Sequence, residues 1–155
     1  MNEIMFKAKK GKRLTALLAA ALMLAGCGEG VYSLPKNAKE FEQTTYVNEK
    51  DEDDTYMAIN YGGREYVYYG SLKNKMREDD VYGCIGYIDG DENARLCVLR
   101  TTKDYIMQRY VNGFMDQPIF YRAEDTMGEE IYTPGYIQCV ECKLWDSEND
   151  GDETE

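Results

Sequence analysis

The chain has 155 residues, with 29 acidic and 18 basic side chains and a net charge of −11 at pH 7. This acidic balance argues against nucleic acid as a partner and against direct adhesion to anionic lipid, because both need a basic surface. The chain also lacks histidine, which excludes Ser–His and Cys–His nucleophile pairs and imidazole-based zinc or iron sites, so carboxylate pairs and thiolates are the chemistries that remain.

The first 26 residues have the pattern of a secretory signal peptide. Basic side chains between Lys7 and Arg13 precede a run of 12 residues, Leu14–Ala25, in which only Thr15 is polar. A helix of that length spans about 18 Å, well short of the ~30 Å hydrocarbon core of a membrane. A membrane helix that stays in the mature protein is therefore disfavoured, and a leader that is removed is favoured.

The leader ends in Leu24-Ala25-Gly26-Cys27. These four residues resemble the lipobox of bacterial lipoproteins, in which a small residue precedes an obligatory cysteine. The resemblance implies that the Cys27 sulfur is lipidated and that the signal is cleaved between Gly26 and Cys27. The mature protein would then be held by its lipid on the outer, extracytoplasmic face of the cell membrane. A plain signal peptide, the alternative, usually ends in an A-x-A-like site.

Cleavage at Cys27 would leave 129 residues, enough for one domain with its own core. The leader contains five of the 18 basic and one of the 29 acidic residues, which leaves 13 basic and 28 acidic residues and a net charge of −15. Residues 27–40 lack a sustained apolar period and are predicted to be a spacer between the lipid and a β domain at residues 41–145. Residues 146–155 include six acidic and no apolar side chain, which predicts a disordered tail.

Residues 41–145 predict an all-β fold. Short β-rich runs follow one another at intervals of about 8–12 residues, which is typical of a single small antiparallel sandwich or open barrel, here of about seven to eight strands. Strands are expected at Phe41–Val47, Thr55–Tyr61, Arg64–Tyr69, Val81–Ile88, Ala94–Thr101, Ile119–Glu124 and Tyr136–Trp145. The segment Tyr105–Val111 fits either a strand or a helix.

Turn residues separate these runs. Gly62-Gly63 can adopt the positive φ angles of a tight hairpin turn, and Asp89–Asn93 is expected to close a second hairpin. Further loops and turns are expected at Asn48–Asp54, Ser71–Asp80, Asn112-Gly113 and Asp125–Gly128.

Four short motifs carry a wider resemblance. They are Tyr61-Gly62-Gly63-Arg64-Glu65-Tyr66, Cys84-Ile85-Gly86-Tyr87-Ile88, Val98-Leu99-Arg100 and Ile119-Phe120-Tyr121-Arg122. Their order is similar to that in small Gram-positive lipoproteins of unassigned function. The resemblance covers about residues 59–123, and it implies a β fold and an extracytoplasmic address but no activity.

Two pairs of cysteines follow Cys27. If Gly90-Asp91 forms the centre of the second hairpin, Cys84 and Cys97 lie opposite each other at a distance that suits a disulfide, which export permits. The alternative is that both pack as small hydrophobic side chains in the core. Cys139 and Cys142 lie three residues apart in an expected strand, so their side chains are expected on opposite faces, which disfavours a zinc or redox site.

Acidic turns imitate a calcium loop only in part. The segment Asp89–Asn93 has oxygen-bearing side chains, but an EF-hand loop that began there would need a glycine and a closing glutamate farther along, and the sequence has neither at those positions. The acidic tail begins in a similar way and also lacks the closing glutamate. We therefore predict no metal site and no cofactor.

Aromatic side chains are the remaining feature, with 14 tyrosines in the chain. Tyr66 and Tyr68 share one face of their expected strand and Tyr69 lies on the other. Exposed tyrosines would offer a surface for sugar rings or an aromatic partner, whereas buried ones would serve cross-strand packing, which is the more common role. The three residues are kept as a candidate ligand surface.

These features together predict a non-enzymatic, lipid-anchored extracytoplasmic module that binds a protein or a glycan of the cell envelope. One alternative is an enzyme that acts on cell-wall glycans with two carboxyl groups about 5–10 Å apart; no catalytic residue is assigned. Another is a solute-capture lipoprotein, which is disfavoured because 129 residues leave little room for two lobes.

Overall fold

Nine β-strands dominate the described part of the chain, which covers residues 30–112, 117–140 and 142–145 of a computed structural model. The strands are β1 (Lys39–Phe41), β2 (Gln43–Asn48), β3 (Asp51–Tyr61), β4 (Arg64–Leu72), β5 (Val81–Ile88), β6 (Asp91–Leu99), β7 (Tyr105–Tyr110), β8 (Ile119–Ala123) and β9 (Ile137–Cys139). Four single-turn 3-10 helices lie between or beside them: η1 (Gly30–Tyr32), η2 (Glu78–Asp80), η3 (Glu124–Thr126) and η4 (Cys142–Leu144). Within these residues no helix has the length and apolar character needed to cross a membrane.

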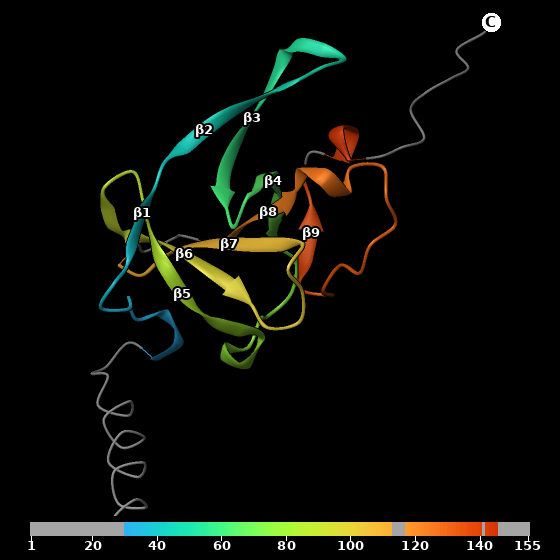
Figure 1. Ribbon diagram of the computed structural model, residues 1–155. Coiled ribbons are helices and arrows are strands. Elements are labelled where there is room, and N and C mark those ends of the chain that lie inside the picture. The colour runs from blue at the N-terminus through green and yellow to red at the C-terminus, as the bar shows by residue number, and fades with distance from the viewer. Residues whose placement is uncertain (1–29, 113–116, 141, 146–155) are drawn as a thin grey trace, which may run out of the picture. The chain divides into compact units, whose positions relative to one another are not determined.

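All nine strands belong to one sheet. Its order is β1-β5-β6-β7-β8-β4-β3-β2, with β9 paired to β4. Neighbouring strands are antiparallel except β1 and β5, which run parallel. Figure 1 shows the sheet curled into an open half-barrel from which β2 and β3 extend as a long hairpin. The predicted all-β fold is confirmed, and the structure has the open barrel rather than the sandwich.

Both predicted hairpins are present. Gly62 and Gly63, with φ angles of 61° and 80°, form the turn between β3 and β4, where a residue with a Cβ would be strained. The second hairpin turns at Asp89-Gly90, with φ angles of 51° and 76°, so its loop is shorter than the predicted five residues. The ambiguous segment after residue 104 is a strand, β7.

Side chains pack on both faces of the curled sheet, because neighbouring residues of a strand point in opposite directions. On β6, Leu96 belongs to one buried cluster, together with Ile59 and Ile106, while Cys97 belongs to the other, together with Val67. A sheet that is covered on both faces needs apolar side chains at consecutive positions, which explains why strict alternation is absent from β6.

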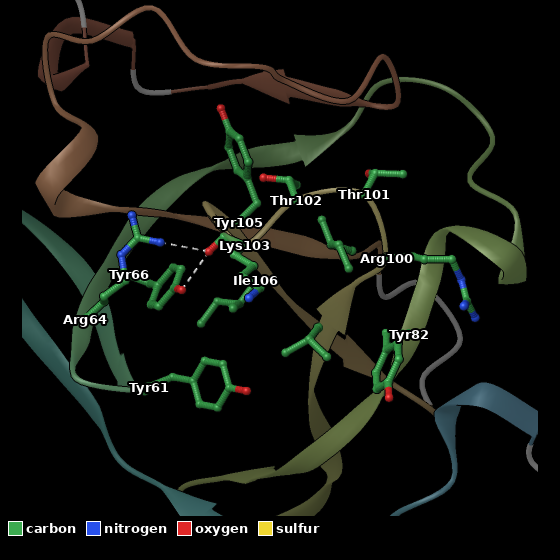
Figure 2. Close-up of a pocket in the computed structure, with 13 residues that line it drawn as sticks. Tyr61, Arg64, Tyr66, Tyr82, Arg100, Thr101, Thr102, Lys103, Tyr105 and Ile106 are labelled. Atoms are coloured by element: carbon green, nitrogen blue, oxygen red, sulfur yellow. Dashed lines mark hydrogen bonds between the residues drawn. The ribbon is translucent and has the colours of Figure 1, made fainter.

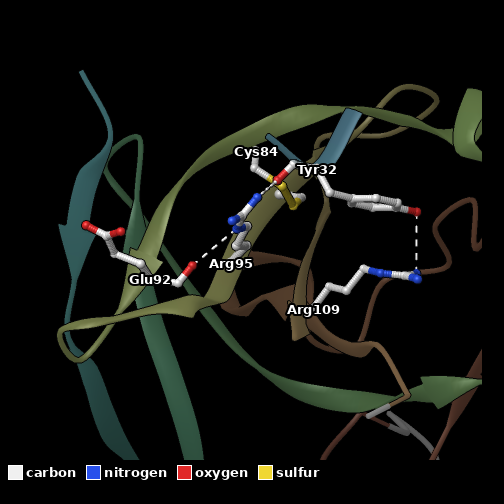
Figure 3. Close-up of a disulfide and its surroundings, with 6 residues drawn as sticks. Tyr32, Cys84, Glu92, Arg95 and Arg109 are labelled. Carbon is white, nitrogen blue, oxygen red and sulfur yellow. Dashed lines mark hydrogen bonds between the residues drawn. A yellow bond between two sulfur atoms is a disulfide. The ribbon is translucent and has the colours of Figure 1, made fainter. Parts of the chain in front are cut away.

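The predicted spacer is wrong for residues 31–40, which are part of the domain. The backbone carbonyl of Tyr32 accepts a hydrogen bond from Arg95, and the Arg109 guanidinium lies 4.3 Å from the centre of the Tyr32 ring (Figure 3). Farther along, β1 pairs with β5, where Lys39 faces Gly86. A Cβ on Gly86 would lie 1.9 Å from the Lys39 carbonyl oxygen, so only glycine permits this approach. Contacts with distant strands order this segment, and local periodicity does not reveal them.

The predicted loop at Asn48–Asp54 is wrong in part, because β3 begins at Asp51 and only Glu49-Lys50 form the turn. The Asp54 carboxylate accepts hydrogen bonds from the Tyr56 hydroxyl at 2.6 Å and from the Asn48 amide at 3.2 Å. The charged side chains at residues 51–53 are exposed, so the strand can continue through them without burying a charge.

The predicted last strand, Tyr136–Trp145, is also wrong beyond Cys139. The chain leaves β9 there, and η4 turns it back towards the core. Trp145 is 5% exposed, its ring centre lies 5.6 Å from that of Tyr69, and its indole nitrogen donates a hydrogen bond to the Tyr68 carbonyl. Burial of this large ring decides the path of the segment, and a continuous strand would carry the ring away.

Smaller boundary differences remain. Strand β6 ends at Leu99, two residues before its predicted end. Strand β4 continues past its predicted end to Leu72, and β8 ends at Ala123, one residue before its predicted end. The predicted turn after β8 is present as η3 followed by Gly128 with a φ of 74°. The leader, the lipobox resemblance, the acidic tail and Gly113 of the predicted turn lie outside the described residues.

Candidate functional site

A pocket of about 660 Å³ opens at one end of the sheet. In the strand order, the beginnings of β4, β5 and β7 and the end of β6 lie at the same end, because these strands alternate in direction through β8. The lining residues are Tyr61, Gly62, Arg64 and Tyr66 of the β3–β4 hairpin, Tyr82 of β5, Val98 and Leu99 of β6, Arg100–Lys103 of the following loop, and Tyr105 and Ile106 of β7. Figure 2 shows Tyr61 and Tyr82 on two sides of the pocket with Ile106 between them.

Arg64 fixes the wall of the pocket. Its guanidinium forms ion pairs with Asp125 at 2.5 Å and with Asp104 at 3.1 Å, and it also donates a hydrogen bond to the Lys103 carbonyl at 3.1 Å. The hydrogen bonds from Arg64 lower the pKa of the Asp125 carboxyl. The same Lys103 carbonyl accepts a hydrogen bond from the buried Tyr66 hydroxyl at 2.8 Å. The charge of Arg64 is thus already compensated, and the backbone of the β6–β7 loop is held at Lys103.

Two other basic side chains line the pocket, Arg100 and Lys103, and their charges are not balanced by carboxylates as the charge of Arg64 is. The Arg100 guanidinium donates hydrogen bonds to the Asp79 and Val81 carbonyls, at 3.0 and 3.5 Å, and lies 5.7 Å from the centre of the Tyr82 ring. The side chain of Lys103 is directed towards the middle of the pocket (Figure 2). Among the described residues, neither Arg100 nor Lys103 forms an ion pair with a carboxylate. The lining contains no Asp or Glu, although the chain as a whole is strongly acidic.

Aromatic rings form two sides of the pocket. Tyr82 is 70% exposed, an unusual position for a large ring. Tyr61 is half-buried, and its ring centre lies 6.1 Å from that of Phe41 and 6.3 Å from that of Tyr66. The packed neighbours hold Tyr61 in place, while Tyr82 offers a free ring face beside a cation. Such a combination suits contact with a ring of a ligand.

The three tyrosines proposed from the sequence do not form one exposed surface. Tyr66 is 3% exposed in the pocket wall, and Tyr69 is buried on the opposite face, where its ring lies 5.2 Å from that of Tyr105. Tyr68 is half-buried and contacts Tyr121 edge to face at 6.4 Å between ring centres. Of these three, only Tyr66 lines the pocket. Tyr69 has the structural role, because it is packed against another ring in the core.

Sequence reasoning missed the side chains that the pocket exposes, Tyr61, Tyr82 and Lys103. One signal was present in the sequence. Arg100 and Lys103 follow a strand directly and flank two threonines, in a chain where acidic residues outnumber basic ones. Nothing local indicated that Tyr61 lies close to this loop, because β8 lies between β7 and β4 in the sheet.

Cys84 and Cys97 face each other across β5 and β6, as the sequence predicted, with 3.8 Å between their Cα atoms. A disulfide joins the two sulfur atoms in the structure (Figure 3). The expected hairpin centre at Gly90-Asp91 is wrong, since the turn is Asp89-Gly90, and register shifts along the hairpin bring the cysteines opposite each other.

Cys139 and Cys142 lie where β9 gives way to η4. The expectation that their side chains point to opposite faces is wrong, because the chain turns there and their sulfur atoms come into bonding contact, with 5.5 Å between the Cα atoms. In the described part of the chain, no group of three or more metal-ligating side chains is found.

A second hollow, of about 570 Å³, contains the carboxylates of Asp51, Asp53 and Asp54 beside Lys143. The hydrogen bonds from Tyr56 and then Asn48 lower the pKa of Asp54. A glycosidase needs a general acid whose pKa is raised. The lowered pKa of Asp54 therefore does not suit it as such a general acid.

Comparison of the chain with known protein families, with curated proteins and with solved structures gives no match. The fold, the pocket and the leader that the sequence predicts are therefore the features on which a function can be argued.

Proposed function

We propose that the protein is a lipid-anchored extracytoplasmic module that binds a component of the cell envelope without catalysis, and that the pocket beside the β6–β7 loop is its binding site. One observation carries the binding function: a pocket of about 660 Å³ gathers tyrosine rings, hydroxyls and uncompensated cations and contains no carboxylate. Its volume lies in the range of small-molecule sites, roughly 300–1,000 Å³.

The chemistry of the lining favours binding over catalysis. The pocket has no carboxylate, thiol or imidazole that could act as a general base near neutral pH. Burial raises the pKa of Tyr66, and it raises the pKa of Tyr105 to about 12, so both phenols stay protonated at neutral pH. The remaining polar groups can hold and orient a ligand.

The proposed anchor would keep the domain close to the membrane. Val31 and Tyr32 pack against the core of the domain, and only three residues separate Val31 from Cys27. At 3.8 Å between consecutive Cα atoms, the lipid-bearing residue lies at most about 15 Å from Val31. A component of the envelope near the membrane surface is thus within reach.

The anchor is tested in a bacterial host with radiolabelled palmitate, with and without globomycin, which blocks lipoprotein signal cleavage. We expect the wild-type chain to be labelled and to sediment with membranes. The Cys27→Ala variant should accumulate as unlabelled precursor, whereas the wild type in globomycin should accumulate as precursor that still carries the label. Normal maturation of the variant would refute lipidation at Cys27.

The binding site is tested separately, with delipidated cell-wall fragments of Gram-positive and Gram-negative bacteria. We expect the full-length chain to be retained on one of the two preparations and the Tyr82→Ala variant to be retained less. Tyr132→Ala is the matched control, because Tyr132 is 64% exposed and lies outside the pocket lining. Equal retention of both variants and the wild type would refute the pocket as the binding site.

A further inference from the structure

We infer that the ligand of this pocket is an anionic saccharide, a sugar unit that carries a carboxylate or a phosphate group. The inference rests on the proposed function, since it names the class of ligand for the same site. Three features of the lining carry it: the positive charge, the exposed ring faces and the hydroxyl groups.

Lys103 and Arg100 supply the positive charge. The Lys103 ammonium is exposed to solvent and directed towards the middle of the pocket, and its backbone is held by the hydrogen bonds from Arg64 and Tyr66 (Figure 2). Arg100 lies at the rim beside Tyr82, and its Nη1 group forms no hydrogen bond among the described residues. Both cations can therefore donate charge-assisted hydrogen bonds to an incoming anion without first breaking an ion pair.

The number of cations limits the kind of anion. Nucleic acids are held by many phosphate contacts, about six to ten in a typical protein–DNA complex. This pocket offers two uncompensated cations on a chain with a net charge of −11, so the long-range field repels a polyanion of high charge density. One anionic group on a small unit matches the site.

The ring faces indicate what else the ligand contains. Tyr61 and Tyr82 stand on two sides of the pocket with Ile106 between them (Figure 2), and the apolar side chain of Val98 also lines the pocket. An aromatic ring combines an apolar face with a polar hydroxyl, and a sugar ring likewise combines an apolar C–H face with hydroxyls along its edge. The chemistry of the two tyrosines thus suits a saturated ring with polar edges.

Hydroxyl groups complete the match. The Thr102 hydroxyl oxygen accepts a hydrogen bond from the Asp104 backbone nitrogen at 3.0 Å, which leaves its hydrogen available to a ligand. Tyr61 directs its hydroxyl towards the pocket (Figure 2). Hydroxyl groups of this kind can both donate to and accept from sugar hydroxyls, whereas the oxygens of a phosphate group use them mainly as donors.

The test measures binding to the full-length chain, purified in a detergent without a sugar head group, by isothermal titration calorimetry. The carboxylate arm compares galacturonic acid with its neutral methyl ester. The phosphate arm compares glucose 6-phosphate with glucose and with inorganic phosphate. We expect at least one anionic sugar to bind about fivefold more tightly than its neutral counterpart and than inorganic phosphate.

Two substitutions separate the roles of charge and ring. Lys103→Gln should weaken the anionic sugar about fivefold and leave the neutral one unchanged, whereas Tyr82→Ala should weaken both about threefold to tenfold. Both side chains are exposed, so neither change disturbs the core. Lys75→Gln and Tyr132→Ala, at exposed positions outside the pocket lining, should bind as the wild type does.

Several outcomes would overturn the inference: no saccharide binds, the neutral sugars bind as tightly as the anionic ones, inorganic phosphate binds as tightly as the sugar phosphate, or Lys103→Gln changes nothing. If the chain is retained on cell walls through Tyr82 but binds none of these sugars, the ligand class is wrong and the proposed binding site stands. If the chain is also not retained on cell walls, both the ligand class and the proposed binding site are refuted.

Discussion

Removal of the Cys84–Cys97 disulfide should destabilise the domain markedly. The two cysteines are 13 residues apart, and closing a loop of that size lowers the entropy of the unfolded chain by an amount equal to about 3 kcal/mol at 25 °C. Cys97 is fully buried and Cys84 nearly so, so loss of their sulfur atoms adds a smaller packing term. For a domain of this size the expected decrease in Tm is about 10–15 °C.

The assay is urea unfolding of the full-length chain in a Cys27→Ala background, which removes the fifth thiol and prevents exchange. Three samples are compared: oxidised protein, the same protein after reduction, and a Cys84→Ala/Cys97→Ala variant. With a slope of about 1.5 kcal/mol per M, the unfolding midpoint should fall by about 2 M in the third sample. Reduction also opens the Cys139–Cys142 pair, so the midpoint of the reduced sample should fall at least as far.

A Cys139→Ala/Cys142→Ala variant is the matched control. The loop between Cys139 and Cys142 is much shorter than that between Cys84 and Cys97. The same entropy relation therefore gives a decrease in the free energy of unfolding that is about 1 kcal/mol smaller. Equal midpoints for the oxidised and reduced samples would refute the reasoning. Alkylation of Cys84 in the folded chain without prior reduction would show that no bridge is present.

Three further predictions follow from contacts in the fold. Gly86→Ala should detach β1, because the new Cβ would lie 1.9 Å from the Lys39 carbonyl oxygen. We expect the free energy of unfolding to fall by about 2 kcal/mol and hydrogen exchange at residues 39–41 to become faster. Unchanged exchange at these residues would contradict the prediction. Trp145→Ala should lower the free energy of unfolding, measured in urea, by about 3–5 kcal/mol. A decrease below about 1 kcal/mol would show that the ring is not packed in solution. Because Arg64 holds the pKa of Asp125 below its usual value, this pair stabilises the fold above about pH 4 and its contribution disappears as the pH falls through the lowered pKa. Arg64→Met should therefore narrow the difference in stability between pH 7 and pH 3, and an unchanged difference would refute the pairing.

Local chemistry in the sequence was sufficient for the hairpins and the fold class. Gly62-Gly63 predicted the β3–β4 turn because two positive φ angles in succession strongly favour glycine. The spacing of β-rich runs predicted an all-β domain, and its open barrel was one of the two architectures expected. The lipid anchor at Cys27 stays a prediction, since it concerns a chemical modification and residues outside the described structure.

The register of Cys84 and Cys97 was predicted correctly from a hairpin centre that is wrong. The turn begins one residue earlier than assumed, and shifts in the ladder between β5 and β6 offset this difference. Such bulges depend on how the strand curves within the whole sheet. They leave no clear signature among the residues of the hairpin.

The paths of the terminal segments and the pocket were decided by tertiary structure alone. Tyr32 and Trp145 are fixed by partners more than 60 residues away, Arg95 and Tyr68. Tyr61 and Lys103 meet at one pocket because β4 pairs on one side with β3, its neighbour in sequence, and on the other with β8, which is distant in sequence. A period of two tells which residues of a strand share a face, but the choice of neighbouring strand depends on which edges bury the most apolar surface together, and that is a property of the complete sheet.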